Sequence, residues 1–240
     1  MKIIEKLKAK QESIYGAEPV TIAFLGDSVT QGCFECYLTS PTSLQTVFDY
    51  PNAYSTRVRE MFNLLYPNAQ VNIVNSGISG DNATNGFSRL ERDILRFNPD
   101  LVVVGFALND SCSGADGLER YKNSIRSILE TLQAKGIECI LLTPNMMNTN
   151  TSCHLRDELF IRLAKQFAEV QNSGMLTAYV DAEKAIANEL GVPVCDVYAK
   201  WLQMQEGGVE ITELLANKLN HPVRELHYYT AMKLLEVMFS

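Results

Sequence analysis

The sequence predicts an α/β fold in three layers (α/β/α), with helices on both faces of a central parallel sheet of about five strands. Short apolar runs rich in β-branched residues recur along the chain, and amphipathic segments with helical periodicity lie between them. Strands and helices that alternate in this way form parallel sheets through right-handed crossovers. The runs are continuously apolar, which indicates strands buried on both faces.

Five apolar runs are expected to form the strands. In chain order they are Val20–Leu25, Val71–Val74, Leu101–Val104, Ile137–Leu142 and Leu176–Val180. The clearest helix is expected over Asp116–Ala134, because its apolar residues share one face and Gly136 follows as a stop signal. Two further amphipathic stripes run from Leu155 to Val170 and from Tyr228 to Met238.

Two segments are expected to be long irregular elaborations of this plan, Cys33–Pro51 and Val192–Asn220. One domain over residues 1–240 is expected, because a chain of 240 residues can bury a large core and shows no repeat or flexible linker. The hydrophobic share of 46% and the charged share of 20% are ordinary for a globular protein.

The net charge of -7 and the sequence pI near 5.1 disfavour nucleic acid and anionic membranes as partners. No stretch approaches 18 apolar residues, so membrane insertion is not expected. The first residues lack the apolar core of a signal peptide, which favours a cytoplasmic location. The sequence does not indicate an oligomeric state.

Six scattered cysteines are expected to be reduced thiols. Cys33 and Cys36 form a C-x-x-C pair, which leaves a thioredoxin-like redox protein as one alternative. A structural zinc site would need a second pair or suitably spaced histidines, so no metal and no cofactor are expected.

A serine follows the first expected strand, in the segment GDSVTQG that runs from Gly26 to Gly32. Ser28 there is a candidate nucleophile, because a helix N-terminus and backbone amides stabilise negative charge that develops beside it. Taken alone, a serine at this place is also a common helix N-cap.

Polar residues follow the next two strands as well. Gly80 lies after the second, and Asn109 lies after the third. A glycine N–H and an asparagine amide can form an oxyanion hole, which stabilises an anionic tetrahedral intermediate without an added charge. Alternatively, Gly80 supplies a turn with positive φ, and Asn109 with Asp110 caps a helix.

Only three histidines are candidates for a general base. His221 precedes Pro222 and the last amphipathic stripe, so it lies in a loop that proline stiffens. His154 and His227 are expected in or beside helices and are weaker candidates.

The segments GDSVTQG, SGD, GFALND and NHP, in this order, resemble the four sequence blocks of the SGNH (GDSL-like) hydrolase superfamily. The resemblance covers nearly the whole chain and implies a flavodoxin-like α/β/α fold. It also implies Ser28 as nucleophile, His221 as base, and an oxyanion hole of Ser28, Gly80 and Asn109. Asp27, Asp110 and Asn217 are candidates for supporting roles.

One position departs from this resemblance. The family often places an aspartate three residues before the histidine, where this sequence has Lys218. Asn217 or a backbone carbonyl could orient the imidazole instead. Asp181 or Asp196 could approach from elsewhere in the fold, and sequence spacing does not decide between them.

The resemblance implies a serine esterase acting on short acyl esters, with acetyl esters of a small molecule or oligosaccharide as the expected substrate. One alternative is a lysophospholipase or acyl-thioesterase with a long apolar groove, which Met146 and Met147 or the segment Phe34–Leu44 could provide. Another is a sugar-binding module without catalytic activity.

Overall fold

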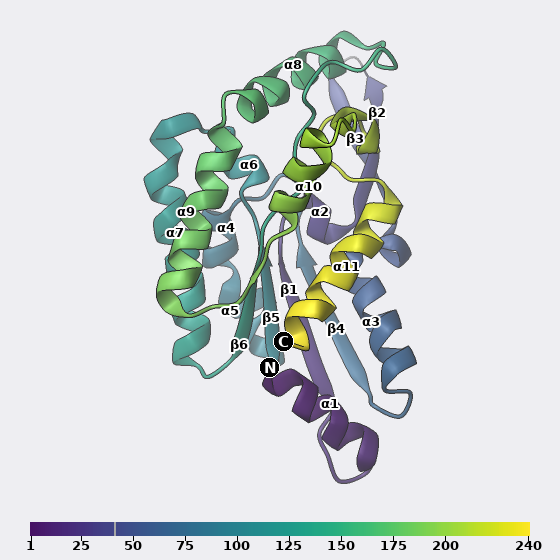
Figure 1. Cartoon of the computed structure of the whole chain (residues 1–240), viewed down its shortest axis with the longest axis vertical. Helices are drawn as coiled ribbons and strands as arrows, with labels where there is room; N and C mark the ends of the chain where they lie inside the picture. The colour runs from purple at the N-terminus through teal and green to yellow at the C-terminus, as the bar shows by residue number, and fades with distance from the viewer. Residues whose placement is uncertain (41) are drawn as a thin grey trace.

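The structure is a computed structural model that describes residues 1–40 and 42–240, and it has the three predicted layers (Figure 1). All strand pairs of the central sheet are parallel. In spatial order the strands are β4 (Val71–Gly77), β1 (Val20–Gly26), β5 (Leu101–Gly105), β6 (Glu138–Leu142) and β7 (Val194–Cys195). This is the flavodoxin-like strand order, which confirms the predicted fold class.

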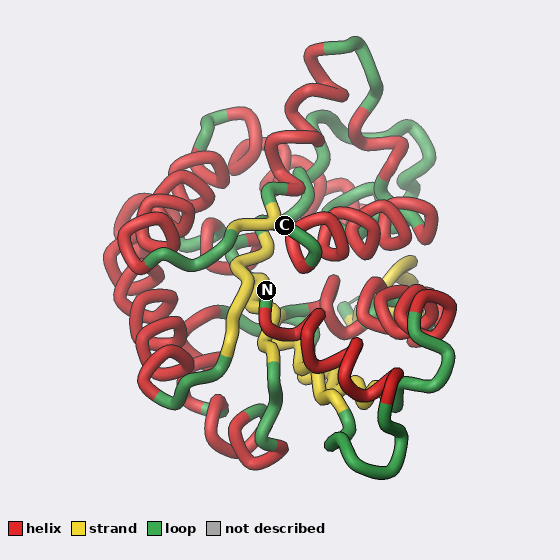
Figure 2. Tube along the Cα trace, turned by 60° about the horizontal axis from the view of Figure 1, so that its bottom comes forward, coloured by secondary structure: helices red, strands yellow, loops and turns green. Residues whose placement is uncertain are grey.

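Helices cover both faces of the sheet, as Figures 1 and 2 show. One face carries α4 (Ala83–Ser88), α5 (Leu90–Asp93), α7 (Gly114–Ala134) and α9 (Met175–Leu190). The other carries α1 (Lys2–Glu12), α3 (Tyr54–Leu65) and α11 (Arg224–Met238). Toward the carboxyl ends of the strands lie α2 (Ser28–Gln31), α6 (Leu108–Ser111), α8 (Glu158–Asn172) and α10 (Val197–Glu206).

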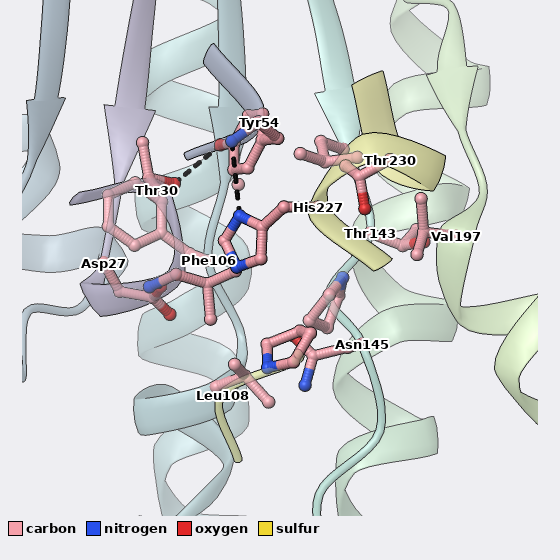
Figure 3. Close-up of a pocket in the computed structure, with 15 residues that line it drawn as sticks. Asp27, Thr30, Tyr54, Phe106, Leu108, Thr143, Asn145, Val197, His227 and Thr230 are labelled. Atoms are coloured by element: carbon pink, nitrogen blue, oxygen red, sulfur yellow. Dashed lines mark hydrogen bonds between the residues drawn. The ribbon is translucent and has the colours of Figure 1, made fainter. Parts of the chain in front are cut away.

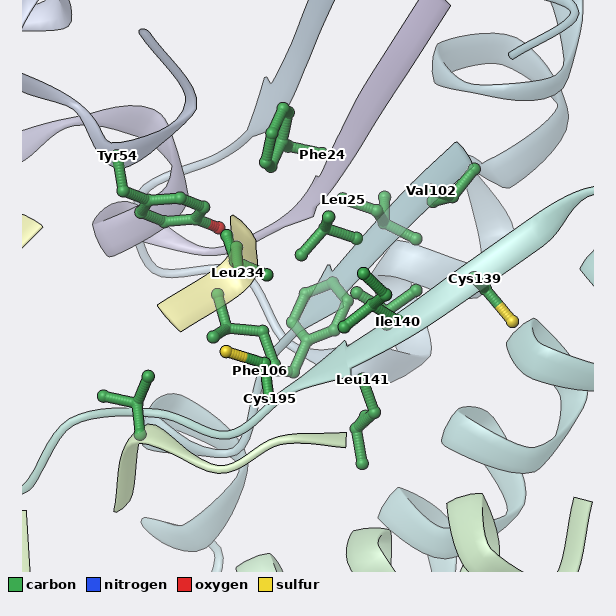
Figure 4. Close-up of a cluster of buried hydrophobic side chains, with 14 of the residues drawn as sticks. Phe24, Leu25, Tyr54, Val102, Phe106, Cys139, Ile140, Leu141, Cys195 and Leu234 are labelled. Carbon is green, nitrogen blue, oxygen red and sulfur yellow. The ribbon is translucent and has the colours of Figure 1, made fainter. Parts of the chain in front are cut away.

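The hydrophobic core lies between these layers. Residues of β1, β5 and β6 are almost all buried, and Figure 4 shows side chains of these strands in one cluster with Tyr54 of α3 and Leu234 of α11. The outer strand β4 is more exposed than these three, as befits an edge of the sheet. Burial on both faces of the central strands explains why their sequences read as continuous apolar runs.

The fifth predicted strand was wrong. Leu176–Val180 lies within α9, and the fifth strand is the two-residue β7. Leu176, Val180 and Ile186 are buried at helical spacing, and Gly174 and Gly191, both with positive φ, bound the helix. A short continuous apolar run shows neither the helical nor the strand periodicity. The helix-forming residues that follow it therefore favour a helix over the whole segment.

The two segments predicted to be irregular contain regular elements. Within Cys33–Pro51, the strands β2 (Cys33–Ser40) and β3 (Ser43–Phe48) form an antiparallel hairpin. Pro41 lies outside the described residues. Within Val192–Asn220 the chain forms β7, α10 and a short 3₁₀ helix.

All six cysteines, which lie in the described part of the chain, are free thiols. Burial raises the pKa of Cys33 to about 12 and also raises that of Cys36. Activated redox cysteines have lowered pKa values instead, so the C-x-x-C pair lacks the signature of a thioredoxin-like site. No helix in residues 1–40 and 42–240 is both long enough and apolar enough to cross a membrane.

Glu183 is a buried acid in the α9 layer. Its carboxyl accepts a hydrogen bond from the Tyr121 hydroxyl, and one of its oxygens has no hydrogen-bond partner among the described residues. Burial raises the pKa of Glu183 well above its usual value. An acid whose pKa rises on folding favours the folded state at low pH, and that contribution is lost as the pH rises.

We therefore expect Glu183→Gln, which mimics the neutral acid, to raise the melting temperature at pH 8 by about 2–4 °C for each kcal/mol gained. The gain should shrink toward pH 4, where the glutamate is protonated in both states. Thermal unfolding at both pH values measures this. Glu189→Gln, at an exposed position of the same helix, is the control. An equal change in both variants would contradict the prediction.

Candidate active site

Ser28 is the first residue of α2, immediately after β1. The preceding residue, Asp27, caps this helix, because its Oδ1 accepts a hydrogen bond of 3.0 Å from the Val29 N–H. The alternative of Ser28 as N-cap is therefore wrong for this helix. Its hydroxyl is left available for chemistry at the carboxyl-end edge of the sheet.

The structure brings His221 to this hydroxyl. The Nε2 of His221 lies 3.0 Å from the Ser28 Oγ, and its Nδ1 lies 2.9 Å from the backbone oxygen of Phe34. A carbonyl oxygen can only accept, so Nδ1 carries the proton and Nε2 presents its lone pair to the serine. Both side chains are at least 95% buried.

Asn217 shapes the loop that carries the imidazole but does not contact the ring. Its Oδ1 accepts hydrogen bonds of 2.9–3.0 Å from the backbone N–H groups of Leu219, Asn220 and His221. The Asn145 amide also holds this loop, by donating to the Asn220 carbonyl at 2.8 Å. The sequence left open whether Asn217 or a backbone carbonyl orients the imidazole, and in the structure a backbone carbonyl contacts Nδ1.

Asp181 and Asp196, which could have oriented the imidazole, and Asp110, a candidate for a supporting role, are exposed or make other contacts. Asp196 caps α10 and pairs with Lys184, and Asp181 is exposed on α9. Asp110 accepts from the Ala83 and Ala107 N–H groups. Lys218, at the position of the familial aspartate, turns to Glu213 at 2.8 Å with a φ of 58°.

Phe34 is the site residue that sequence reasoning missed. Its contribution is a backbone oxygen, which every residue has, so its side chain carries no signal. Only the fold of the β2–β3 hairpin, which follows α2 directly, places this oxygen beside His221. No motif in the sequence could have identified it.

Gly80 and Asn109 both lie at the same edge of the sheet as Ser28. The loop with Gly80 is bound to the nucleophile segment, because the Ile78 N–H donates to the Gly26 carbonyl at 3.1 Å. Asn109 joins this loop by donating from Nδ2 to the Asp81 carbonyl at 2.8 Å. The N–H groups of Ser28 and Gly80 have no hydrogen-bond partner in residues 1–40 and 42–240, so both remain available as donors.

Arg89 is a buried residue that holds this arrangement and that the sequence motifs did not indicate. Its guanidinium donates to Asp81 Oδ2 at 2.7 Å, the Ser76 carbonyl at 2.6 Å and the Gly26 carbonyl at 2.9 Å. Arg89 and Asp81 are each about 6% exposed. The planar fork of arginine suits this several-way bridge between β1, β4 and the loop with Gly80.

Burial shifts the pKa values of the ionisable groups at the site. It lowers the pKa of His221 to about 4, although the hydrogen bond to Phe34 and the charge of Glu35 act in the opposite direction. It raises the pKa of Asp27 to about 7 and that of Asp110 to about 6. The imidazole is therefore neutral, and able to accept a proton, over the whole physiological pH range.

The other two histidines do not reach Ser28. His154 is exposed in the loop before α8, and His227 is buried in α11. Figure 3 shows His227 beside a cavity of about 30 Å³, with its Nδ1 accepting from the Tyr54 N–H at 3.2 Å. Asp27 and Asn145 also line this cavity, which has room for about two water molecules and is too small for a sugar.

Among the described residues, clusters of three or more His, Cys, Asp or Glu side chains suited to a metal ion are absent. The site instead combines a buried hydroxyl, a neutral imidazole of fixed tautomer and available N–H donors. Serine hydrolases use this set of groups for acyl transfer. The site thus defines a class of ester-cleaving or amide-cleaving enzyme.

The sequence profile of the GDSL-like lipase/acylhydrolase family matches residues 24–227. The chain therefore belongs to this family, as its motifs predicted, and it is a carboxylic ester hydrolase with the SGNH fold.

Two curated proteins are similar in sequence. An acetylxylan esterase of Geobacillus stearothermophilus is 29% identical over 177 residues, which cover 68% of this chain and 76% of the relative. A protein of Bacillus subtilis described as the uncharacterized lipoprotein YqeF is 24% identical over 210 residues, covering 84% and 79%.

Solved structures share the fold. The acetylxylan esterase Axe2 of G. stearothermophilus superposes with a TM-score of 0.66 at 20% identity, covering 91% of this chain and 94% of Axe2. A two-domain esterase active on acetylated mannans superposes with a TM-score of 0.67 at 21% identity. This chain covers 52% of that esterase, about half its length, and 99% of the chain is matched.

The His221 loop depends on one acceptor, Asn217 Oδ1, which satisfies three backbone N–H groups. Because each buried N–H left unpaired costs about 1 kcal/mol or more, we expect Asn217→Ala to lose about 2–4 kcal/mol of stability. This corresponds to a melting temperature lower by about 4–16 °C. Asn217→Asp keeps the acceptor and should lose less than half as much. Thermal unfolding checks both, and an Asn217→Ala variant as stable as the wild type would refute the assignment.

Proposed function

We propose that the chain hydrolyses short acyl esters, acetyl esters above all, on carbohydrate substrates. The observation that carries this proposal is the 3.0 Å contact between Ser28 Oγ and His221 Nε2, because it joins a nucleophile to a base of fixed tautomer. The acetylxylan esterase relative and the mannan-active structural neighbour support acetylated carbohydrate as the substrate class.

In the proposed reaction, His221 Nε2 takes the hydroxyl proton as Ser28 Oγ attacks the acyl carbon. The N–H groups of Ser28 and Gly80 and the amide of Asn109 stabilise the oxyanion that forms, and a donor of this kind typically contributes about 3–4 kcal/mol. His221 then returns the proton to the leaving sugar hydroxyl. A water molecule, deprotonated by His221, finally releases the acetate from Ser28.

The orienting group in this proposal is the Phe34 carbonyl, so the machinery is a Ser–His dyad with an uncharged third partner. A carbonyl fixes the tautomer as a carboxylate does, although it stabilises the imidazolium less. In this proposal the dyad can act without the aspartate that the family often has three residues before the histidine.

The long-chain alternatives have less support. Met146 and Met147, which suggested an apolar groove, are completely buried in the core. In the segment Phe34–Leu44, Phe34 is also buried, between His227 and Arg224, whereas Tyr37 and Leu44 are exposed. The three buried side chains therefore do not line an open acyl groove.

Hydrolysis of acetylated xylooligosaccharides, and of p-nitrophenyl esters of increasing chain length, tests the proposal. We expect the highest kcat/KM for acetate, with loss of at least about a thousandfold in Ser28→Ala and in His221→Ala. A fluorophosphonate probe should label the wild type and fail to label Ser28→Ala. Rates that rise with chain length would reject the acetyl substrate, and an active Ser28→Ala would reject the mechanism.

The pH dependence follows from the lowered pKa of His221. With a pKa of about 4 the base stays neutral down to acidic pH, so kcat/KM should change less than about twofold between pH 8 and pH 5.5. An ordinary histidine would cause about a tenfold loss over this range. Rate measurements on p-nitrophenyl acetate check this. Asp27→Asn, which keeps the oxygen that caps α2, shows whether any remaining step belongs to Asp27.

A further inference from the structure

The hairpin that carries the Phe34 carbonyl is not part of the central sheet. Among the described residues, strands β2 and β3 pair with each other and with no other strand, and Figure 1 shows them beyond the carboxyl-end edge of the main strands. The position of this oxygen relative to His221 therefore depends on contacts between the hairpin and the rest of the molecule. A displacement of about 1 Å in such a contact can cost a hundredfold in rate.

Arg224 makes several of these contacts from the first turn of α11, three residues after His221. Its two terminal nitrogens donate to the two carboxylate oxygens of Glu35 at 2.6 and 3.1 Å. Its Nε donates to Asp49 Oδ2 at 2.6 Å, and its guanidinium lies 4.4 Å from the centre of the Phe34 ring. One side chain thus holds both sides of the hairpin and the residue that orients the base.

The charges of this cluster also suit the reaction. The bonds to Arg224 lower the pKa values of Glu35 and Asp49, so both carboxylates stay ionised and the three groups carry a net charge of about -1 at neutral pH. Glu35 is the one charged side chain that raises the pKa of His221 among the described residues. A negative charge on this side favours the imidazolium that forms during catalysis.

We propose that Arg224, Glu35 and Asp49 form a clamp that positions the Phe34 carbonyl on His221 and supplies the negative charge that an aspartate would otherwise provide. The proposal rests on the proposed function of the Ser28–His221 dyad. Within it, the three residues are positioning residues, because they touch neither the substrate nor the serine. Isolated ion pairs at partly exposed sites contribute little to stability, so the effect of the clamp should appear in catalysis.

Arg224→Met tests the positioning by the clamp, because methionine keeps an apolar contact with the Phe34 ring but loses the bonds to Glu35 and Asp49, while both negative charges remain. The chain offers a matched control in Arg126→Met. Arg126 makes a similar two-bond contact with Glu189 on the helix layer away from the site, and both arginine side chains are 33% exposed. Glu35→Gln is a milder second variant that keeps the bond from Arg224 to Asp49.

We expect Arg224→Met to lower kcat for p-nitrophenyl acetate by about tenfold to a hundredfold with little change in KM. Glu35→Gln should lower kcat by a smaller factor, and Arg126→Met should leave it unchanged. The proton resonance of His221 Nδ1–H, measured by NMR, should persist in Arg126→Met and broaden or vanish in Arg224→Met. Melting temperatures of the two arginine variants should agree within about 3 °C.

A wild-type kcat and an intact Nδ1–H resonance in Arg224→Met would overturn the clamp. If Arg224→Met melts much earlier than Arg126→Met, the kcat and resonance of Glu35→Gln decide in its place. The proposed function is tested separately by Ser28→Ala. An inactive Ser28→Ala together with a fully active Arg224→Met would leave the dyad standing and remove only the clamp.

Discussion

Close packing at two glycines, Gly26 and Gly77, at the carboxyl ends of neighbouring strands is the constraint on which the site depends. Gly26, Gly77 and Gly105 lie in register on β1, β4 and β5. A Cβ at Gly26 would collide with the Thr30 side chain and the Gly105 carbonyl, and one at Gly77 would collide with the backbone of Gln31. Without side chains at these points, α2 can pack directly against the strand ends, so Ser28 lies within reach of loops from both neighbours.

Two different means then fix the loops around that hydroxyl. Buried Arg89 bridges the ends of β1 and β4 to Asp81, whose carbonyl holds Asn109. Asn217 gathers three successive N–H groups of the other loop and fixes the approach of His221. Both sets of bonds satisfy buried polar groups that would otherwise cost free energy, so the stability of the fold and the geometry of the candidate site depend on the same bonds.

The sequence predicted the layers of the fold, four of the five strands and the side chains that meet at the sheet edge. These features leave local signals in the sequence, namely apolar runs and turn residues. The chain also has three histidines, so few residues compete for the role of the base. The strand at Leu176–Val180 failed because five apolar residues fit a helix as well as a strand. The contact of the Phe34 backbone oxygen with His221 and the bridge made by Arg89 join residues that are far apart in the sequence. Neither contact depends on a motif that can be recognised in a single sequence.

In the proposed mechanism, an uncharged acceptor on His221 changes how much each group must contribute to stabilising the transition state. A buried imidazole with a carbonyl partner has a low pKa, so it remains a free base in acid but gains less from forming imidazolium. In that mechanism the transition state would depend more on donors to the oxyanion and on distant charge. The support of Asn109 through Asp81 and Arg89, and the net charge of the hairpin contacts beside Phe34, would meet these two demands. Loss of one support should therefore weaken a dyad of this kind more than it would weaken a triad that holds its own carboxylate.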